Sequence, residues 1–241
     1  MNSMEKATLV NFFKKIDYNW KNDFEEISYI CKYTKTRKNS KVSEFVMPYG
    51  SEQTFFIKAI LDFVGCEKYF EIGTGRGTSA YVSSLSPTVN EIITLDKIPF
   101  SRKRSMAINY EETVLSLKDL NSQIKIKTKY KIKFLHSSYK IILAIANFSK
   151  FDVAFIDGDH DHQLIIYLDF IICWMITKRD GVIIFDDYEL KRFKVKKIVD
   201  TLRKLFKKHN FLLIHTRGHL FDKSNIDDIN GMVLMSRSKF L

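Results

Sequence analysis

Two acids and a histidine follow directly after an apolar run in this sequence. The segment FDVAFIDGDHDHQ, residues 151–163, is apolar apart from its second residue until it presents Asp157, Asp159 and His160. A carboxylate can hold a divalent cation, and an imidazole titrates near neutral pH and can take up a proton. Such chemistry requires these side chains to lie close to other polar groups. Whether they do depends on the helices and strands that position them.

From residue 68 onward, short apolar runs alternate with segments of helical spacing. The runs occupy residues 68–72, 91–95, 131–135, 151–156, 181–185, 211–215 and 232–235. The helical segments occupy residues 78–85, 102–120, 139–147, 162–176 and 193–208. This alternation predicts an α/β Rossmann-like fold, with parallel strands and helices on both faces of a seven-stranded mixed sheet. The last two runs lack a helix between them, which predicts a C-terminal antiparallel strand pair.

The polar endings of the predicted parallel strands fall on one edge of the sheet, where ligands collect in such folds. Asp157 ends the fourth run, and Asp186 and Asp187 end the fifth. If these strands are neighbours, three carboxylates meet there, and they repel one another unless a positive group lies among them. Mg²⁺ or a similar divalent cation would bind their oxygen atoms and lower the pKa of a bound hydroxyl. The alternative is that Asp186 and Asp187 cap a turn.

The first strand ends in the glycine-rich stretch FEIGTGRGTSA. Gly73, Gly75 and Gly77 alternate there, and glycine allows a backbone to approach a ligand closely. The helix that follows has free N–H groups at its start, which favour an anionic group. Asp96 ends the next strand and can accept hydrogen bonds from ribose hydroxyls. The stretch therefore predicts a nucleoside cofactor, and the alternative is a tight turn beside a solvated acid.

From about Ser51 to Arg237 the chain resembles class I S-adenosylmethionine-dependent methyltransferases. The motifs that carry the resemblance are EIGTGRGTS, ITLD, FLHSS, FDVAFIDGDH and GVIIFDDY. The last two resemble the metal-dependent sugar O-methyltransferase branch, of the macrocin O-methyltransferase type. The resemblance implies S-adenosyl-L-methionine and a divalent cation such as Mg²⁺ as cofactors. It implies a small-molecule or glycan acceptor, methylated on a sugar hydroxyl.

The resemblance also assigns roles to individual residues. The cofactor would be bound by Glu71, Gly73, Thr74, Gly75, Gly77, Thr78, Asp96, Lys97, His136, Ser137 and Asp157. The metal ion would be held by Asp157, Asp186 and Asp187. The base that takes the acceptor proton would be His160 or Asp159, and His160 is favoured because its ordinary pKa lies near the working pH. His162 is a weaker candidate.

The amino-acid composition limits the cellular compartment and the alternative functions to be considered. The three cysteines are scattered, which argues against disulfides and structural zinc and favours a reducing cytoplasm. The sequence shows neither a signal peptide nor an apolar run long enough to span a membrane. The net charge of +11 raises an RNA methyltransferase as an alternative, although the lysines are dispersed and nucleic acid is not the expected partner. A non-catalytic scaffold with the same fold is the other alternative.

The N-terminal part precedes the region of resemblance. We expect a helical extension over residues 1–50 and a methyltransferase domain over residues 51–241. Apolar residues spaced by three and four predict a helix over residues 4–37, with one face toward the core or toward a second copy of the chain in a homo-oligomer. Ser51 is a candidate cap for the next helix.

Overall fold

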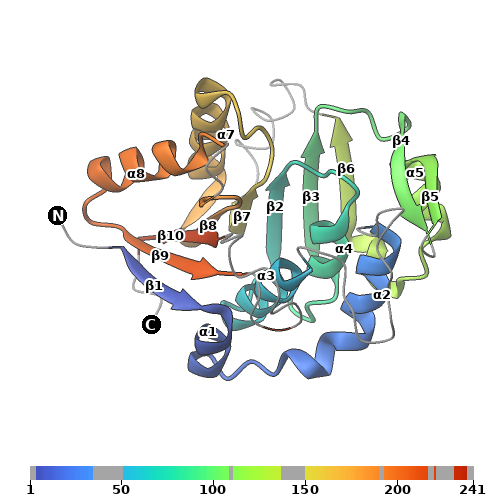
Figure 1. Cartoon of the computed structure of the whole chain (residues 1–241), viewed down its shortest axis with the longest axis horizontal. Coiled ribbons are helices and arrows are strands. Elements are labelled where there is room, and N and C mark those ends of the chain that lie inside the picture. The colour runs from blue at the N-terminus through green and yellow to red at the C-terminus, as the bar shows by residue number, and fades with distance from the viewer. Residues whose placement is uncertain are drawn as a thin grey trace.

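The computed structural model describes residues 4–34, 51–108, 111–136, 150–189, 193–216, 220 and 231–237. An eight-stranded mixed sheet forms its centre, with helices on both faces (Figure 1). The strands are β1 (Glu5–Thr8), β2 (Lys68–Ile72), β3 (Glu91–Asp96), β4 (Lys103–Ile108), β5 (Glu111–Ser116), β6 (Ile132–His136), β7 (Phe151–Ile156), β8 (Thr177–Phe185), β9 (Asn210–His215) and β10 (Gly231–Ser236). The helices are α1 (Leu9–Lys15), α2 (Phe24–Thr34), α3 (Glu52–Phe63), α4 (Thr78–Ser84), α5 (Leu117–Gln123), α7 (Gln163–Ile176) and α8 (Val195–Leu205), with 3₁₀ helices η1 (Trp20–Asp23) and η2 (Lys127–Lys131).

The predicted fold class is confirmed. The strand order is β1-β9-β10-β8-β7-β2-β3-β6, and the strands from β8 to β6 pair in parallel. Strand β10 is antiparallel to both β8 and β9, as the missing helix between the last two runs predicted. The seven expected strands are joined by an eighth, β1, which pairs in parallel with β9.

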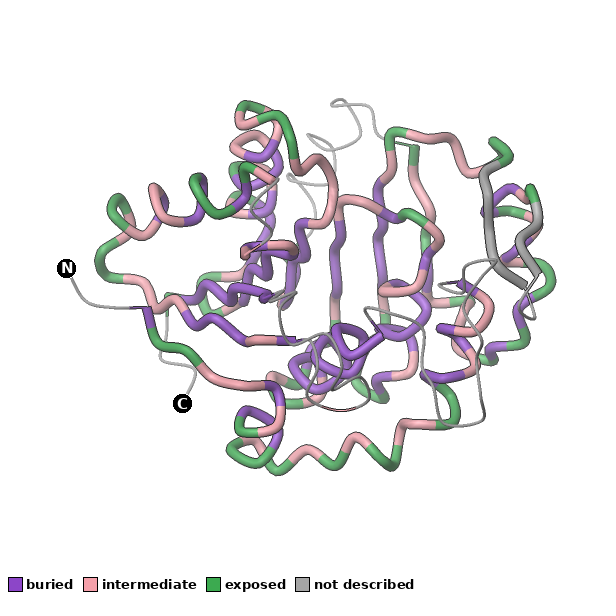
Figure 2. The backbone as a smooth tube through the Cα atoms, viewed as in Figure 1, coloured by how far each residue is buried: buried purple, intermediate pink, exposed green. Residues whose placement is uncertain are grey.

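Alternate residues of the central strands enter two separate apolar layers. In β7, Val153 and Phe155 join the layer under α1 to α5, while Ala154 and Ile156 join the layer under α7 and α8. Figure 2 shows the resulting buried strands at the centre of the molecule. A strand covered on both faces has to be apolar throughout, which explains why these runs do not alternate with polar residues.

The predicted N-terminal helix over residues 4–37 is wrong, because the described part forms β1, α1, η1 and α2. Asp17 has a left-handed backbone with φ of 54°, and the side chain of Asn19 accepts a hydrogen bond from the Lys21 N–H to begin η1. Such local contacts compete with helical hydrogen bonds and break the helix between α1 and α2. Four of the apolar residues whose spacing by three and four predicted this helix are nevertheless buried: Leu9, Phe13, Ile27 and Cys31.

The predicted helix over residues 102–120 is wrong at its start. Strands β4 and β5 pair antiparallel in a separate two-stranded sheet, and only then does α5 begin. Ser116 accepts a hydrogen bond from the Asp119 N–H, and the Asp119 carboxylate accepts one from the Ser116 N–H. This reciprocal cap fixes the start of the helix at Leu117.

The helix expected over residues 139–147 and the domain boundary expected at residue 50 fall outside the described residues. The described N-terminal segment packs on the rest of the chain, since β1 joins the main sheet and Trp20 contacts Phe55 of α3 at a ring distance of 6.0 Å. Ser51 precedes α3 without a side-chain capping hydrogen bond.

None of the described helices is long and apolar enough to cross a lipid bilayer.

A buried cation joins the N-terminal segment to α3. Lys58 is 4% exposed and forms ion pairs with Asp62 of its own helix and with Asp23 of η1, the latter at 3.7 Å. Asp23 also accepts a hydrogen bond of 2.6 Å from the Tyr18 hydroxyl, and Asp62 accepts one of 2.7 Å from Ser86. Lys58 therefore balances two carboxylates that come from different parts of the chain.

We expect Lys58→Met to lower the free energy of unfolding by about 3 kcal/mol, because it leaves two partly buried carboxylates without their cation. Lys118→Met is the matched control, since Lys118 is exposed, and it should change stability by less than about 0.5 kcal/mol. Urea unfolding measures both variants. A loss of less than about 1 kcal/mol in Lys58→Met, typical of a surface pair, would contradict this role.

Candidate cofactor and metal site

Three neighbouring strands deliver the candidate residues to one edge of the sheet. Ile156 of β7 pairs with Ile72 of β2 on one side and with Phe185 of β8 on the other. The polar residues that follow these strands therefore lie side by side at the carboxyl edge. The carboxylates that follow the fourth and fifth predicted strands could meet only if those strands were neighbours. These strands, β7 and β8, do pair with each other.

The glycine turn, residues 73–77, is locked against the end of β7. Gly73 has φ of 102°, and a Cβ there would overlap the carbonyl group of Asp157 and lie 2.8 Å from the Gly158 nitrogen. The Gly73 N–H also donates a hydrogen bond of 2.8 Å to the Leu95 carbonyl of β3. Only a residue without a side chain fits between these strands.

The other glycines shape the surface of the turn. Gly75 has φ of 53°, and a Cβ there would meet no atom within 4 Å, so open space lies over it. Gly77 has φ of 81° and directly precedes α4. Thr78 begins α4, and its hydroxyl donates a hydrogen bond of 2.7 Å to that of Thr34. The turn thus presents bare backbone toward the carboxyl edge.

Asp96 holds the glycine turn from the end of β3. Its Oδ2 accepts a hydrogen bond of 2.9 Å from the Gly75 N–H, and its Oδ1 accepts one of 2.8 Å from the Ile98 N–H. These two bonds fix the Asp96 carboxylate at the carboxyl edge beside the glycine turn. His136 lies opposite Asp96 on β6, and its Nε2 is 3.1 Å from the Lys97 carbonyl oxygen. Ser137 lies outside the described residues.

Glu71 lies beneath the glycine turn. It is fully buried and accepts hydrogen bonds from the hydroxyls of Thr94, at 2.6 Å, and Tyr69, at 3.1 Å. The Thr74 hydroxyl lies 2.6 Å from that of Thr94 and extends this network. Burial raises the pKa of Glu71 to about 7, against hydrogen bonds that lower it. Glu71 supports the turn from below, and its contact with a cofactor stays a prediction.

The N-terminal segment also reaches the glycine turn. The Arg76 guanidinium donates a hydrogen bond of 3.0 Å to the carbonyl of Thr34, which ends α2. A cation at the C-terminal end of a helix is favourable because the helix dipole is negative there. Sequence reasoning missed both residues, since they lie far apart in the chain and only the fold brings them together.

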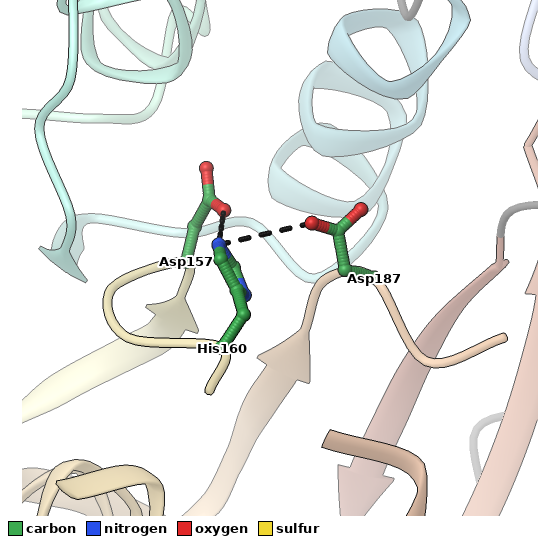
Figure 3. A group of neighbouring side chains, drawn as sticks. All are labelled: Asp157, His160 and Asp187. Carbon is green, nitrogen blue, oxygen red and sulfur yellow. Dashed lines mark ion pairs between the residues drawn. The ribbon is translucent and has the colours of Figure 1, made fainter. Parts of the chain in front are cut away.

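The His160 ring lies between two carboxylates, as Figure 3 shows. Its Nε2 is 3.4 Å from Asp157 Oδ1 and 3.7 Å from Asp187 Oδ2, and one ligand atom of each residue lies within 4.8 Å of the others. The ring also stacks on Phe193 at 4.7 Å. Partial burial lowers the pKa of His160, but the carboxylates of Asp157 and Asp187 raise it by a larger amount. The net shift of the pKa is therefore upward.

Asp186 contacts α3. It is 7% exposed, and its Oδ1 accepts hydrogen bonds from the Gln53 amide, at 2.9 Å, and the Asp187 N–H, at 2.8 Å. The structure thus brings Asp157 and Asp187 together with His160, and it places Asp186 against Gln53. Asp186 as a metal ligand stays a prediction.

Asp159 is engaged within its own turn. Its carboxylate accepts hydrogen bonds from the N–H groups of Asp161, at 2.9 Å, and His162, at 2.8 Å, and lies 3.0 Å from the His162 ring. Partial burial raises the pKa of Asp159, but these hydrogen bonds outweigh burial and lower it. The geometry favours His160 over Asp159 as the base, because the Asp159 acceptor sites are used in shaping the turn.

A buried acid on α7 lies directly under this turn. Asp169 is 9% exposed, and its Oδ2 has no hydrogen-bond partner among the described residues. A Cβ on Gly158 would lie 3.1 Å from that oxygen, so the turn packs on the carboxyl group. Burial raises the pKa of Asp169 to about 7, with the charge of Asp159 adding to the rise and His160 opposing it.

Known proteins share this arrangement of elements. Residues 70–188 match the family described as a methyltransferase domain. This matched segment runs from β2 through the glycine turn and the turn after β7 to the residue after Asp187. Residues 70–188 are therefore similar to methyltransferase domains, and the chain has the Rossmann-like methyltransferase fold.

Two solved structures share this fold. The O-methyltransferase TomG from Streptomyces achromogenes, solved with SAM, has a TM-score of 0.59 at 12% identity, over 90% of this chain and 89% of that one. An O-methyltransferase from Bacillus cereus, solved with SAH, has a TM-score of 0.58 at 15% identity, over 95% and 97%. At these identities the likeness is one of fold, and the sugar-specific branch stays a prediction.

A viral protein is similar in sequence. Uncharacterized protein R132 of Acanthamoeba polyphaga mimivirus is 26% identical over 121 residues, which are 50% of this chain and 51% of that protein. The matched part of the chain therefore spans about half the length of this curated relative.

Substitutions at two glycines can separate the structural role of the turn from its predicted contact with the cofactor. We expect Gly73→Ala to prevent folding, because its Cβ would overlap the backbone of Asp157. Gly75→Ala should fold with a loss of about 1–2 kcal/mol from its left-handed backbone, since space is open there. Its methyl group should still weaken binding of S-adenosylhomocysteine in calorimetry. Wild-type affinity in Gly75→Ala would place the cofactor elsewhere.

Asp169 should make the stability of the protein depend on pH. Its folded pKa of about 7 lies above the unfolded value, so its stabilisation is complete below about pH 4 and is lost as pH rises through about 7. We expect Asp169→Asn to reduce the loss of stability between about pH 5 and pH 8 by about 2 kcal/mol in urea unfolding. Parallel curves for both proteins would contradict the raised pKa.

Proposed function

We propose that this protein is an O-methyltransferase that uses S-adenosylmethionine and a divalent cation, with a sugar hydroxyl of a glycan or glycosylated metabolite as its acceptor. The observation that carries the proposal is the convergence of Asp157, His160 and Asp187 beside the glycine turn. The O-methyltransferases of Streptomyces achromogenes and Bacillus cereus, which share the fold, support transfer to oxygen.

The carboxyl edge fits the cofactor. The backbone at Gly75, where a Cβ would meet no atom within 4 Å, can lie along the methionine part, and the carboxylate of Asp96 at the end of β3 suits ribose hydroxyls. When bound, S-adenosylmethionine supplies a methyl group on a good leaving group. The protein then has two tasks, which are to align the acceptor oxygen with that methyl group and to remove the hydroxyl proton.

The donor set fits a divalent cation. Asp157 and Asp187 face the same imidazole, and their two negative charges favour a positive group in the space between them. These two carboxylates would hold the ion, with Asp186 as the third ligand that the sequence suggests. When bound, the ion would lower the pKa of the acceptor hydroxyl. If His160 itself ligates, its nitrogen suits Mn²⁺ or Zn²⁺ better than Mg²⁺.

His160 is the proposed base. Its ring is held by stacking on Phe193, and its backbone carbonyl accepts a hydrogen bond of 2.8 Å from the Lys194 N–H. The Nε2 atom therefore has a fixed position toward the carboxylates that would bind the acceptor's metal ion. In the neutral form this nitrogen can accept the hydroxyl proton, and Asp157 and Asp187 stabilise the imidazolium that results.

Binding and mutation test the proposal together. Wild-type protein should bind S-adenosylhomocysteine in calorimetry and Mn²⁺ in electron paramagnetic resonance. Asp157→Asn and Asp187→Asn should weaken Mn²⁺ binding by about 100-fold or more, because each removes a charged ligand. Asp187→Asn should leave cofactor affinity nearly unchanged, and both substitutions should abolish transfer of a labelled methyl group to sugar acceptors. Asp161→Asn, an exposed change in the same turn, is the control and should behave like wild type.

Each failure has a different meaning. A folded protein that does not bind S-adenosylhomocysteine would overturn the cofactor assignment. Loss of cofactor binding in Asp157→Asn would assign Asp157 to the nucleoside pocket. Mn²⁺ binding that is insensitive to both substitutions would exclude the metal site and leave His160 as the sole means of activating the hydroxyl.

A further inference from the structure

A hydrogen-bond chain runs from α3 to the acidic pair that follows β8. Gln53 is 7% exposed, and its amide Nε2 donates to Asp186 Oδ1 at 2.9 Å. The same carboxylate oxygen accepts the backbone N–H of Asp187 at 2.8 Å. Two donors from distant parts of the chain thus meet on one buried oxygen atom.

The backbone of Asp187 needs such support. Its φ is 55°, in the left-handed region that residues with a side chain rarely adopt. A strained conformation persists where its surroundings hold it in place, and such residues gather at functional sites. The bond from the Asp187 N–H to Asp186 Oδ1 holds this conformation, and in it the Asp187 carboxylate faces His160 at 3.7 Å.

The position of Gln53 suits this task. It is the second residue of α3, and the positive end of the helix dipole favours the charge of the Asp186 carboxylate beside it. The start of α3 is tied down in turn, because the adjacent Glu52 accepts a hydrogen bond of 2.8 Å from the Leu220 N–H. Gln53 therefore offers its amide from a fixed, buried element.

We propose that Gln53 is a positioning residue for the site, which fixes Asp186 and through it the left-handed turn that aims Asp187 at His160. Gln53 touches neither His160 nor Asp157 in this role. Its effect on metal binding rests on the proposed function, whereas its effect on the geometry of Asp187 does not. This gives the inference two independent measurements.

The first measurement is metal affinity in Gln53→Met, which keeps the length and bulk of the side chain but cannot donate a hydrogen bond. We expect Mn²⁺ binding to weaken by about 10- to 100-fold, as happens when a residue that orients a metal ligand is lost. Affinity for S-adenosylhomocysteine should stay near the wild-type value, because the glycine turn is untouched. General damage to the fold would weaken both. Gln123→Met, at an exposed position on α5, is the matched control and should change neither.

The second measurement is the crystal structure of Gln53→Met. We expect Asp187 to leave the left-handed region or its carboxylate to turn away from His160. An unchanged Asp187 would overturn the inference whatever the affinity for Mn²⁺. If wild-type protein binds no Mn²⁺ but Asp187 moves in the variant, the metal part of the proposed function fails and the positioning role of Gln53 stands. Equal Mn²⁺ affinities of wild type and variant would overturn the role at the metal site.

Discussion

The site depends on the close backbone contact between Gly73 and Asp157. Because no side chain fits between them, the turn after β2 and the turn after β7 are held together as one unit. One carries the surface proposed for the cofactor, and the other carries an acid proposed for the metal ion. The separation between the proposed sites of the methyl donor and the acceptor would thereby be set by paired strands of a buried sheet, which are more rigid than loops. A rigid frame of this kind is what alignment of a methyl transfer requires.

Much of the fold could be predicted because the decisive signals are local. A run of five or six apolar residues with a polar ending identifies a buried parallel strand, and the rule for crossover helices then orders such strands in a sheet. The errors occur where pairing is non-local. Nothing within residues 5–8 indicates a strand, because its partner β9 lies near the other end of the sequence. The start of α5 depends on one capping pair, Ser116 and Asp119, within a longer stretch of helical spacing.

In the candidate site, too, features with local signals could be predicted and features that depend on distant partners could not. Motif and strand order together predicted that Asp157 and Asp187 would lie close, and they share His160 as a neighbour. Sequence alone left Asp159 and His160 as candidates for the base, with His160 favoured for its ordinary pKa, and the hydrogen bonds that the Asp159 carboxylate accepts within its own turn add support for His160. Gln53, Thr34 and Arg76 could not be found from sequence, since each acts through a partner on another element.

The two outer strands of the sheet bear on how copies of this chain can meet. Strand β1, at one edge, is four residues long and exposes Glu5 and Lys6, while β6, at the other, exposes Lys133. Short, charged outer strands discourage the backbone of another molecule from adding to a sheet. Beside β1 in the same sheet lies β9, whose Leu212 and Leu213 are buried. Strand β1 therefore occupies the hydrogen-bonding edge of an apolar strand that would otherwise be open to intermolecular pairing. Copies of this chain would then associate through surfaces other than the edges of the sheet.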